Sequence, residues 1–171
     1  MKVSHRVNRL RRKLTHQLTK NIGKMDCQDD FINLNRSSIK KILVVRPNHR
    51  LGNLLLLTPL IQELEITFPD AKIDVLIKGG LGPIIFKNFQ VIDTIISLPK
   101  RPFSNILKYV SIWVRMIFLK YDLVVDAVKG SSSGKLLTLI SRSENKLYQG
   151  EKYDIFDNGS FHQAKKSIFN L

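Results

Sequence analysis

Hydrophobic positions between residues 39 and 150 follow two patterns, short apolar runs and longer segments with helical spacing. The runs at 42–45, 72–78, 93–98, 121–128 and 145–148 predict five strands. Four segments with helical spacing predict the helices that connect these strands, namely 54–68, 84–89, 103–120 and 135–141. Trp113 lies in the helix predicted over 103–120, where we expect it to be part of the core. Strands that alternate with helices are typical of a parallel sheet with right-handed crossovers, so the sequence predicts an α/β fold.

The amino-terminal segment has a different pattern. Apolar residues three or four positions apart form one stripe of a predicted helix, namely Val3, Val7, Leu10, Leu14, Leu18 and Ile22. Basic residues fill the remaining circumference, so the helix over 1–24 is suited to an anionic membrane surface. The alternatives are a helix packed on its own domain and a solvated tail. We expect 1–38 to be this helix plus a polar linker, and 39–160 to be one Rossmann-like domain.

Charge and composition narrow the kind of partner. The chain has 171 residues, 28 Lys and Arg against 14 Asp and Glu, and one cysteine, Cys27. The net charge of +14 favours anionic partners such as phosphorylated sugars, sugar nucleotides, anionic lipids or nucleic acid. Nucleic acid is the least favoured, because the charge is concentrated outside the α/β core without interleaved aromatic residues. We expect no membrane-spanning helix, because charged residues interrupt the longest apolar segment.

The turn after the first strand is the first place to look for a ligand, because ligands of α/β domains bind beyond the carboxyl ends of strands. Arg46, His49 and Arg50 cluster there and are either anion-binding residues or surface charge. Gly52, in the same turn, is a further acceptor-binding candidate. A single glycine cannot form a dinucleotide fingerprint, and no P-loop is present. His49 has no second His or Cys at ligand spacing, so we expect no metal site.

Several short motifs occur in a particular order along the chain. They read VVRP at 44–47, LGN at 51–53, LTPL at 57–60 and, further on, YDLVVDAVKGSSSGKLLT at 121–138. Together they resemble the bacterial ADP-heptose:lipopolysaccharide heptosyltransferases, glycosyltransferase family 9. The resemblance covers residues 40–150 and implies the amino-terminal half of a GT-B enzyme, in which two Rossmann-like domains face each other.

The resemblance also implies partners and a location. The amino-terminal domain of such an enzyme binds a lipid-linked glycan acceptor, and the carboxyl-terminal domain binds most of the nucleotide-sugar donor. We expect no other cofactor, and we expect a cytoplasmic protein, peripheral on the inner membrane. Residues 161–171 look like the start of the helix that leads to the second domain. No donor-binding motifs follow, so we expect this chain alone to be inactive.

The residues at the family's catalytic positions differ from its pattern. The proposed base of the family is an Asp where this chain has Asn53, and a neutral amide cannot accept a proton at useful pH. Asn53 is either a helix cap or a group that orients an acceptor hydroxyl. Asp126, near the end of the fourth predicted strand, is the candidate base, with the cap of a turn as the alternative.

The serine-rich loop before the last predicted helix is a second candidate for anion binding. Its residues are Ser131, Ser132, Ser133 and Gly134. Backbone N–H groups at a helix start bind anions, and plain helix capping is the alternative. Three functional hypotheses remain at this point, namely half of a glycosyltransferase, a non-catalytic glycan- or lipid-binding module, and a basic membrane-surface or nucleic-acid-binding protein.

Overall fold

The structure, a computed structural model, describes residues 17, 36–100, 106–128 and 131–148. Five parallel strands form one sheet, namely β1 (Lys41–Arg46), β2 (Lys72–Lys78), β3 (Ile92–Leu98), β4 (Leu123–Asp126) and β5 (Asn145–Tyr148). A 3-10 turn, η1 (Arg36–Ser38), precedes β1. The predicted α/β fold class is therefore confirmed. The predicted helices over 1–24 and 161–171 lie outside the described residues, apart from Gln17.

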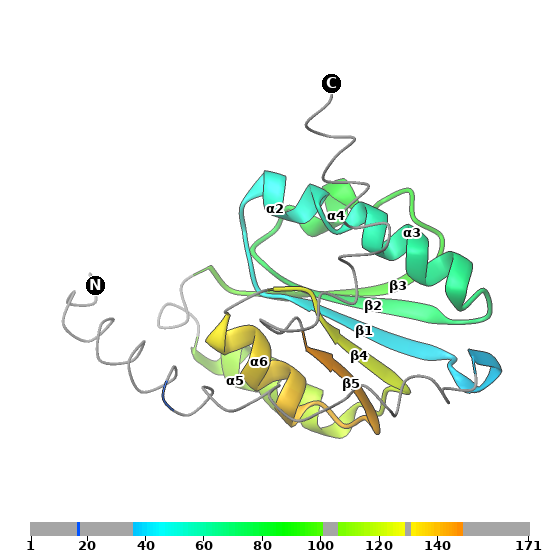
Figure 1. Cartoon of the computed structure of the whole chain (residues 1–171). Coiled ribbons are helices and arrows are strands. Elements are labelled where there is room, and N and C mark those ends of the chain that lie inside the picture. The colour runs from blue at the N-terminus through cyan, green and yellow to red at the C-terminus, as the bar shows by residue number, and fades with distance from the viewer. Residues whose placement is uncertain (1–16, 18–35, 101–105, 129–130, 149–171) are drawn as a thin grey trace.

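Helices cover both faces of the sheet, as Figure 1 shows. One face carries α2 (Leu51–Leu55), α3 (Thr58–Thr67) and α4 (Gly82–Ile85). The other face carries α5 (Ile106–Phe118) and α6 (Ser132–Ile140). Side chains alternate across β1, so Ile42 and Val44 pack under the first group while Leu43 and Val45 pack under the second. Both faces of the central strands are therefore buried, as in other parallel sheets.

The prediction of one helix over residues 54–68 was wrong, because the segment forms two helices. Leu56 and Leu57 lie between α2 and α3, and Pro59 occupies the first turn of α3. Proline fits a first helical turn because its missing N–H has no intrahelical partner there. The Thr58-Pro59 pair in the sequence was the signal for this break.

Other predicted boundaries were also displaced. Helix α4 starts earlier than expected, at Gly82, and α6 begins at Ser132 instead of Lys135. Residues Ser132, Ser133 and Gly134 therefore form the first turn of a helix, and the prediction that they lie in a loop was wrong. The second and fifth strands have the predicted bounds.

Candidate functional site

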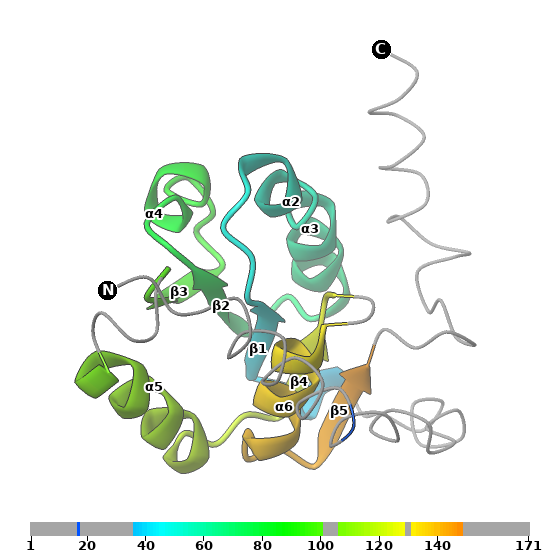
Figure 2. The ribbon, with the colours of Figure 1, turned by 90° about the vertical axis from the view of Figure 1, so that its left-hand side faces the viewer.

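The sheet has a topological switch point between β1 and β4. The strand order is β3-β2-β1-β4-β5. The strands that follow β1 in the chain, β2 and β3, lie on one side of it, and β4 and β5 lie on the other side. The connections that leave β1 and β4 consequently run to opposite faces, and a crevice for ligands forms between the carboxyl ends of such strands. Figure 2 shows β1 and β4 side by side at the centre of this edge. The strand register pairs Val45 with Asp126 there.

Asp126 is the buried acid at this switch point. Its side chain is 1% exposed, and its Oδ1 accepts a hydrogen bond of 3.2 Å from the Val128 N–H. Its Oδ2 is also buried and has no hydrogen-bond partner among the described residues. Burial raises the pKa of Asp126 to about 7, against the opposing effects of the Val128 N–H, Lys135 and Arg46. A carboxylate that titrates near neutral pH is suited to general base chemistry.

The first turn of α6 packs directly against this carboxyl group. Ser131 caps the helix, because its Oγ accepts a hydrogen bond of 3.2 Å from the Gly134 N–H. A Cβ atom at Gly134 would lie only 2.7 Å from Oδ1 of Asp126. A larger residue at 134 would therefore displace the carboxyl group or the first turn of α6. Capping is confirmed for Ser131, and binding of an anion by Ser131, Ser132 and Ser133 stays a prediction.

Arg46 is the buried basic residue at the end of β1, and it contacts the residue that follows Asp126. It is 8% exposed, and its Nη1 donates a hydrogen bond to the Ala127 carbonyl oxygen, which connects the ends of β1 and β4. Its Nε is buried without a partner among the described residues. Burial lowers the pKa of Arg46, and the charge of Asp126 opposes this effect. Arg46 is therefore a fixed buried cation at the switch point and not a residue of the surface turn.

The turn after Arg46 bends away from Asp126 and toward β2. The carbonyl oxygen of Asn48 accepts a hydrogen bond from the Lys78 N–H at 3.1 Å, and the Asn48 side chain accepts one from the Arg50 N–H at 3.0 Å. His49 and Arg50 are exposed, and His49 lies beside Gly79 at the end of β2. The structure therefore places His49 at the end of β2, and Arg50 at the start of α2.

The two remaining candidates of the first motif lie inside a helix. Gly52 and Asn53 are the second and third residues of α2, and Arg50 occupies the N-cap position without a side-chain hydrogen bond. The interpretation of Asn53 as a helix cap was therefore wrong. The Asn48 side chain closes the preceding turn instead. The orientation of an acceptor hydroxyl by Asn53 stays a prediction.

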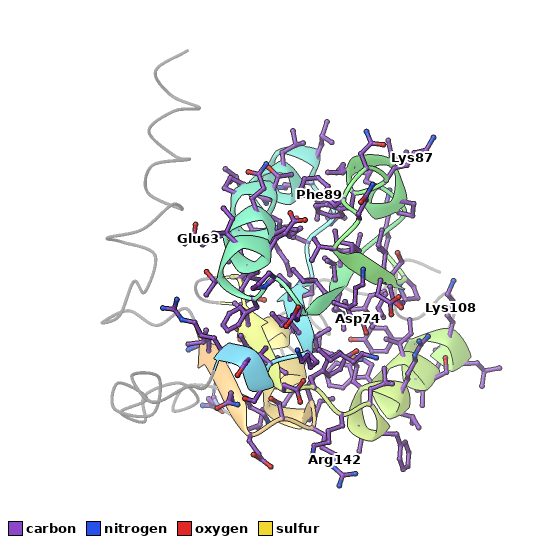
Figure 3. The ribbon with its side chains drawn as sticks, turned by 90° about the vertical axis from the view of Figure 1, so that its right-hand side faces the viewer. Glu63, Asp74, Lys87, Phe89, Lys108 and Arg142 are labelled. Carbon is purple, nitrogen blue, oxygen red and sulfur yellow. The ribbon has the colours of Figure 1, made fainter. Side chains whose placement is uncertain are left out.

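Asp74 is a second buried acid, which the sequence pattern had not identified as a candidate. It is 1% exposed, and Figure 3 shows it in the interior of the molecule. Tyr121 donates a hydrogen bond of 2.8 Å to Oδ2 of Asp74, and Nζ of Lys41 lies 3.8 Å from the same atom. Burial and this hydrogen bond raise the pKa of Tyr121 above its usual range. The signal in the sequence was a single Asp within the apolar run of β2.

A hollow of about 190 Å³ lies at the opposite edge of the sheet from Asp126. Tyr121, Asp122 and Asn145 are among its lining residues. Oδ2 of Asp122 already accepts hydrogen bonds from the backbone N–H groups of Lys40 and Lys41, both 2.9 Å long. These bonds fix the start of β1, so Oδ2 of Asp122 already has a structural role. We therefore assign the functional site to the carboxyl ends of the strands and not to this hollow. Among the described residues, no His, Cys, Asp or Glu side chains gather as a metal-binding group.

The described residues thus define a doubly wound, Rossmann-like α/β domain with a buried carboxyl group, Asp126, and a buried cation, Arg46, at its switch point. The fold is similar to that of the glycosyl transferase family 9 protein from Veillonella parvula DSM 2008, with a TM-score of 0.54 and 19% sequence identity. The match covers 69% of this chain and 33% of that chain, so this chain spans about a third of the neighbour's length. No protein-family model and no curated protein sequence matches the chain.

Proposed function

We propose that this chain is the acceptor-binding domain of a family 9 glycosyltransferase that acts in lipopolysaccharide or other cell-surface glycan assembly. The observation that carries the proposal is the buried carboxyl group of Asp126 at the switch point, where the charge of Arg46 at the end of β1 acts on it. The similar fold of the Veillonella parvula protein and the ordered motifs between residues 44 and 138 support it. Glycosyl transfer to a hydroxyl group needs a base that can ionise near neutral pH, and a carboxyl group with a pKa of about 7 is partly ionised there.

In the proposed reaction, Oδ2 of Asp126 accepts the proton of the acceptor hydroxyl as the hydroxyl oxygen attacks the anomeric carbon of the donor. The bond between that carbon and the diphosphate oxygen breaks, and the nucleoside diphosphate leaves with the bonding electron pair. The acceptor hydroxyl supplies the hydrogen-bond partner that Oδ2 lacks among the described residues.

Arg46 positions the acceptor in this scheme. Its Nη1 is held by the Ala127 carbonyl oxygen, and its Nε is left to donate to an anionic group. A phosphate or carboxylate of a lipid-linked glycan matches this donor, because hydrogen bonds between charged groups are the strong ones. The fixed charge also favours the ionised form of Asp126.

The nucleotide-sugar donor is bound, on this proposal, by a second domain in a longer polypeptide or in a partner protein. The described residues form a single five-stranded sheet, whereas the proposed GT-B architecture requires two Rossmann-like domains. We therefore expect no transfer by residues 1–171 alone, and we expect the assembled enzyme to work at the cytoplasmic face of the membrane.

The test is made in the host, where any further domain is present. Deletion of the gene and the substitution Asp126→Asn are each expected to remove one sugar residue from an envelope glycan, measured by mass spectrometry of extracted glycolipids. Asp70→Asn, an exposed acid paired with Lys40 at 2.9 Å, is the matched control and should leave the glycan unchanged. Normal glycans in the deletion strain would refute the proposal.

A non-catalytic glycan-binding module is the second candidate, and the neutral Asn53 at the family's Asp position favours it. The same experiment separates the two functions. Altered glycans in the deletion strain together with normal glycans in the Asp126→Asn strain would support the binding module and remove Asp126 from the role of base.

A further inference from the structure

Helix α5 has an apolar outer face, which is unusual for the surface helix of an α/β domain. Its inner face packs on the sheet through buried Met116 and the partly buried Tyr109, Ile112 and Trp113. Six apolar residues are exposed on the outer side, namely Ile106 (56%), Leu107 (86%), Val110 (50%), Val114 (44%), Ile117 (49%) and Phe118 (76%). We call these six residues the α5 outer face. They extend from the first to the last residue of the helix.

Helix α3 on the opposite face of the sheet shows the usual arrangement. Its buried side consists of Leu60, Ile61 and Leu64, and its exposed side carries Gln62 and Glu65 beside a single exposed Ile66. Single exposed apolar residues are common on proteins, whereas a continuous exposed apolar surface marks an interaction site. The α5 outer face therefore requires an occupant.

Charge identifies the kind of occupant. The sequence of α5, ILKYVSIWVRMIF, contains no acidic residue, and its polar positions are Lys108, Ser111 and Arg115. These three residues share one stripe at helical spacing, which borders the α5 outer face. All three are exposed, and Figure 3 shows Lys108 projecting from α5 into solvent. An apolar face bordered by cations is the arrangement of a helix that lies in the interface of an anionic membrane.

The other occupants fit this charge pattern less well. A second copy of the chain would bring two cationic stripes together, and each copy carries a net charge of +14. The chain's own segment 1–41 is also basic, with 11 Lys and Arg against 3 Asp and Glu. Like charges at an interface are unfavourable, so both contacts would be opposed. An anionic lipid surface is attracted by the same charges.

We propose that the α5 outer face is a membrane-docking surface that inserts into the interface of a bilayer containing anionic lipid. None of the described helices is long and apolar enough to cross a membrane, so α5 would lie along the surface. Its first residues follow β3 at the carboxyl edge of the sheet, the same edge that holds Arg46 and Asp126. The docking does not depend on the proposed transferase function, because it arises from the surface of α5 alone.

The test is sedimentation of the full 171-residue chain with vesicles of phosphatidylcholine mixed with phosphatidylglycerol, and with vesicles of phosphatidylcholine alone. The double variant Leu107→Gln/Phe118→Gln should lower the partition coefficient on the mixed vesicles at least about tenfold. Ile66→Gln, at 76% exposure on α3, is the matched control and should bind as the parent chain does. Because all three side chains are exposed, the melting temperature should be unchanged in each variant.

The cationic stripe gives a second readout. Lys108→Gln/Arg115→Gln should weaken binding to the mixed vesicles about five- to tenfold. The parent chain should also bind phosphatidylcholine vesicles more weakly than the mixed vesicles, and its binding to the mixed vesicles should weaken in high salt. Equal binding of the Leu107→Gln/Phe118→Gln variant and the parent would overturn the proposal. The proposal would also be overturned if vesicle binding were lost only when residues 1–24 are removed. A chain that does not bind vesicles and forms a dimer that Leu107→Gln/Phe118→Gln dissociates would overturn it as well.

Discussion

Replacing Asp126 with asparagine tests the physical state of the buried carboxyl group at the end of β4. Asparagine has nearly the same shape and carries no charge at any working pH. Burial raises the pKa of Asp126 to about 7, from an ordinary value of 3.8. The folded protein therefore binds the Asp126 proton more tightly than the unfolded chain does, and the substitution removes this difference.

The sign of the effect follows from proton linkage. Between about pH 4 and about pH 7 the folded wild-type protein holds more protons than the unfolded one, so its free energy of unfolding falls as the pH rises. Each pH unit inside this window corresponds to about 1.4 kcal/mol. Between about pH 5 and about pH 8, the wild type loses stability only over the two units up to about pH 7. The free energy of unfolding of Asp126→Asn, relative to that of the wild type, should therefore rise by about 2–3 kcal/mol from about pH 5 to about pH 8.

Denaturant unfolding at the two pH values, followed by circular dichroism, measures this difference. Other titrating groups contribute equally to the wild type and the variant, so they cancel in the comparison. Asp70→Asn is the control, because the hydrogen bond and charge of Lys40 lower the pKa of Asp70 and leave it ionised throughout the interval. Its difference from wild type should therefore be independent of pH. A pH-independent difference for Asp126→Asn would refute the reasoning about burial.

Three further substitutions test packing, two of them around the buried acids and one in α2. Tyr121→Phe removes the hydroxyl group that donates a hydrogen bond of 2.8 Å to Oδ2 of Asp74. Because Oδ1 of Asp74 is already buried without a partner among the described residues, the free energy of unfolding should fall by about 1–3 kcal/mol. Gly134→Ala places a Cβ 2.7 Å from the Asp126 carboxyl group and should cost about 1–3 kcal/mol. Gly52→Ala has open space around the new Cβ inside α2 and should instead stabilise by about 0.5–1 kcal/mol. Denaturant unfolding checks all three, and equal effects of the two glycine substitutions would contradict the close contact at Gly134.

The strands were the most predictable part of the fold, for a physical reason. A strand buried on both faces needs a short, nearly continuous apolar run, and the chain has such runs at β1, β2 and β4. Helix ends were less predictable, since they depend on caps and on single residues such as Pro59. The pattern of α5 showed a helix, but with so many apolar positions it could not show which of them face the sheet.

The candidate site was predictable only in part. Asp126 was identified near the end of a predicted strand and Arg46 in the turn after another, and the neighbouring ends of β4 and β1 place both at the switch point. The direction of the turn after Arg46 is set by the hydrogen bond between Asn48 and Lys78, a contact between residues thirty positions apart. Such a contact is not visible in local patterns, so the position of His49 beside Gly79 at the end of β2 was not predictable.

The central claim, that the carboxyl edge between β1 and β4 binds an anionic glycan acceptor, is tested most directly by nuclear magnetic resonance. The full chain, labelled with ¹⁵N, is titrated with deacylated anionic oligosaccharide from the host envelope. We predict saturable chemical-shift changes centred on the amides of Ala127, Val128 and the first turn of α6, and their loss in Arg46→Gln. No changes, or changes confined to the opposite edge around Asp122, would contradict the account.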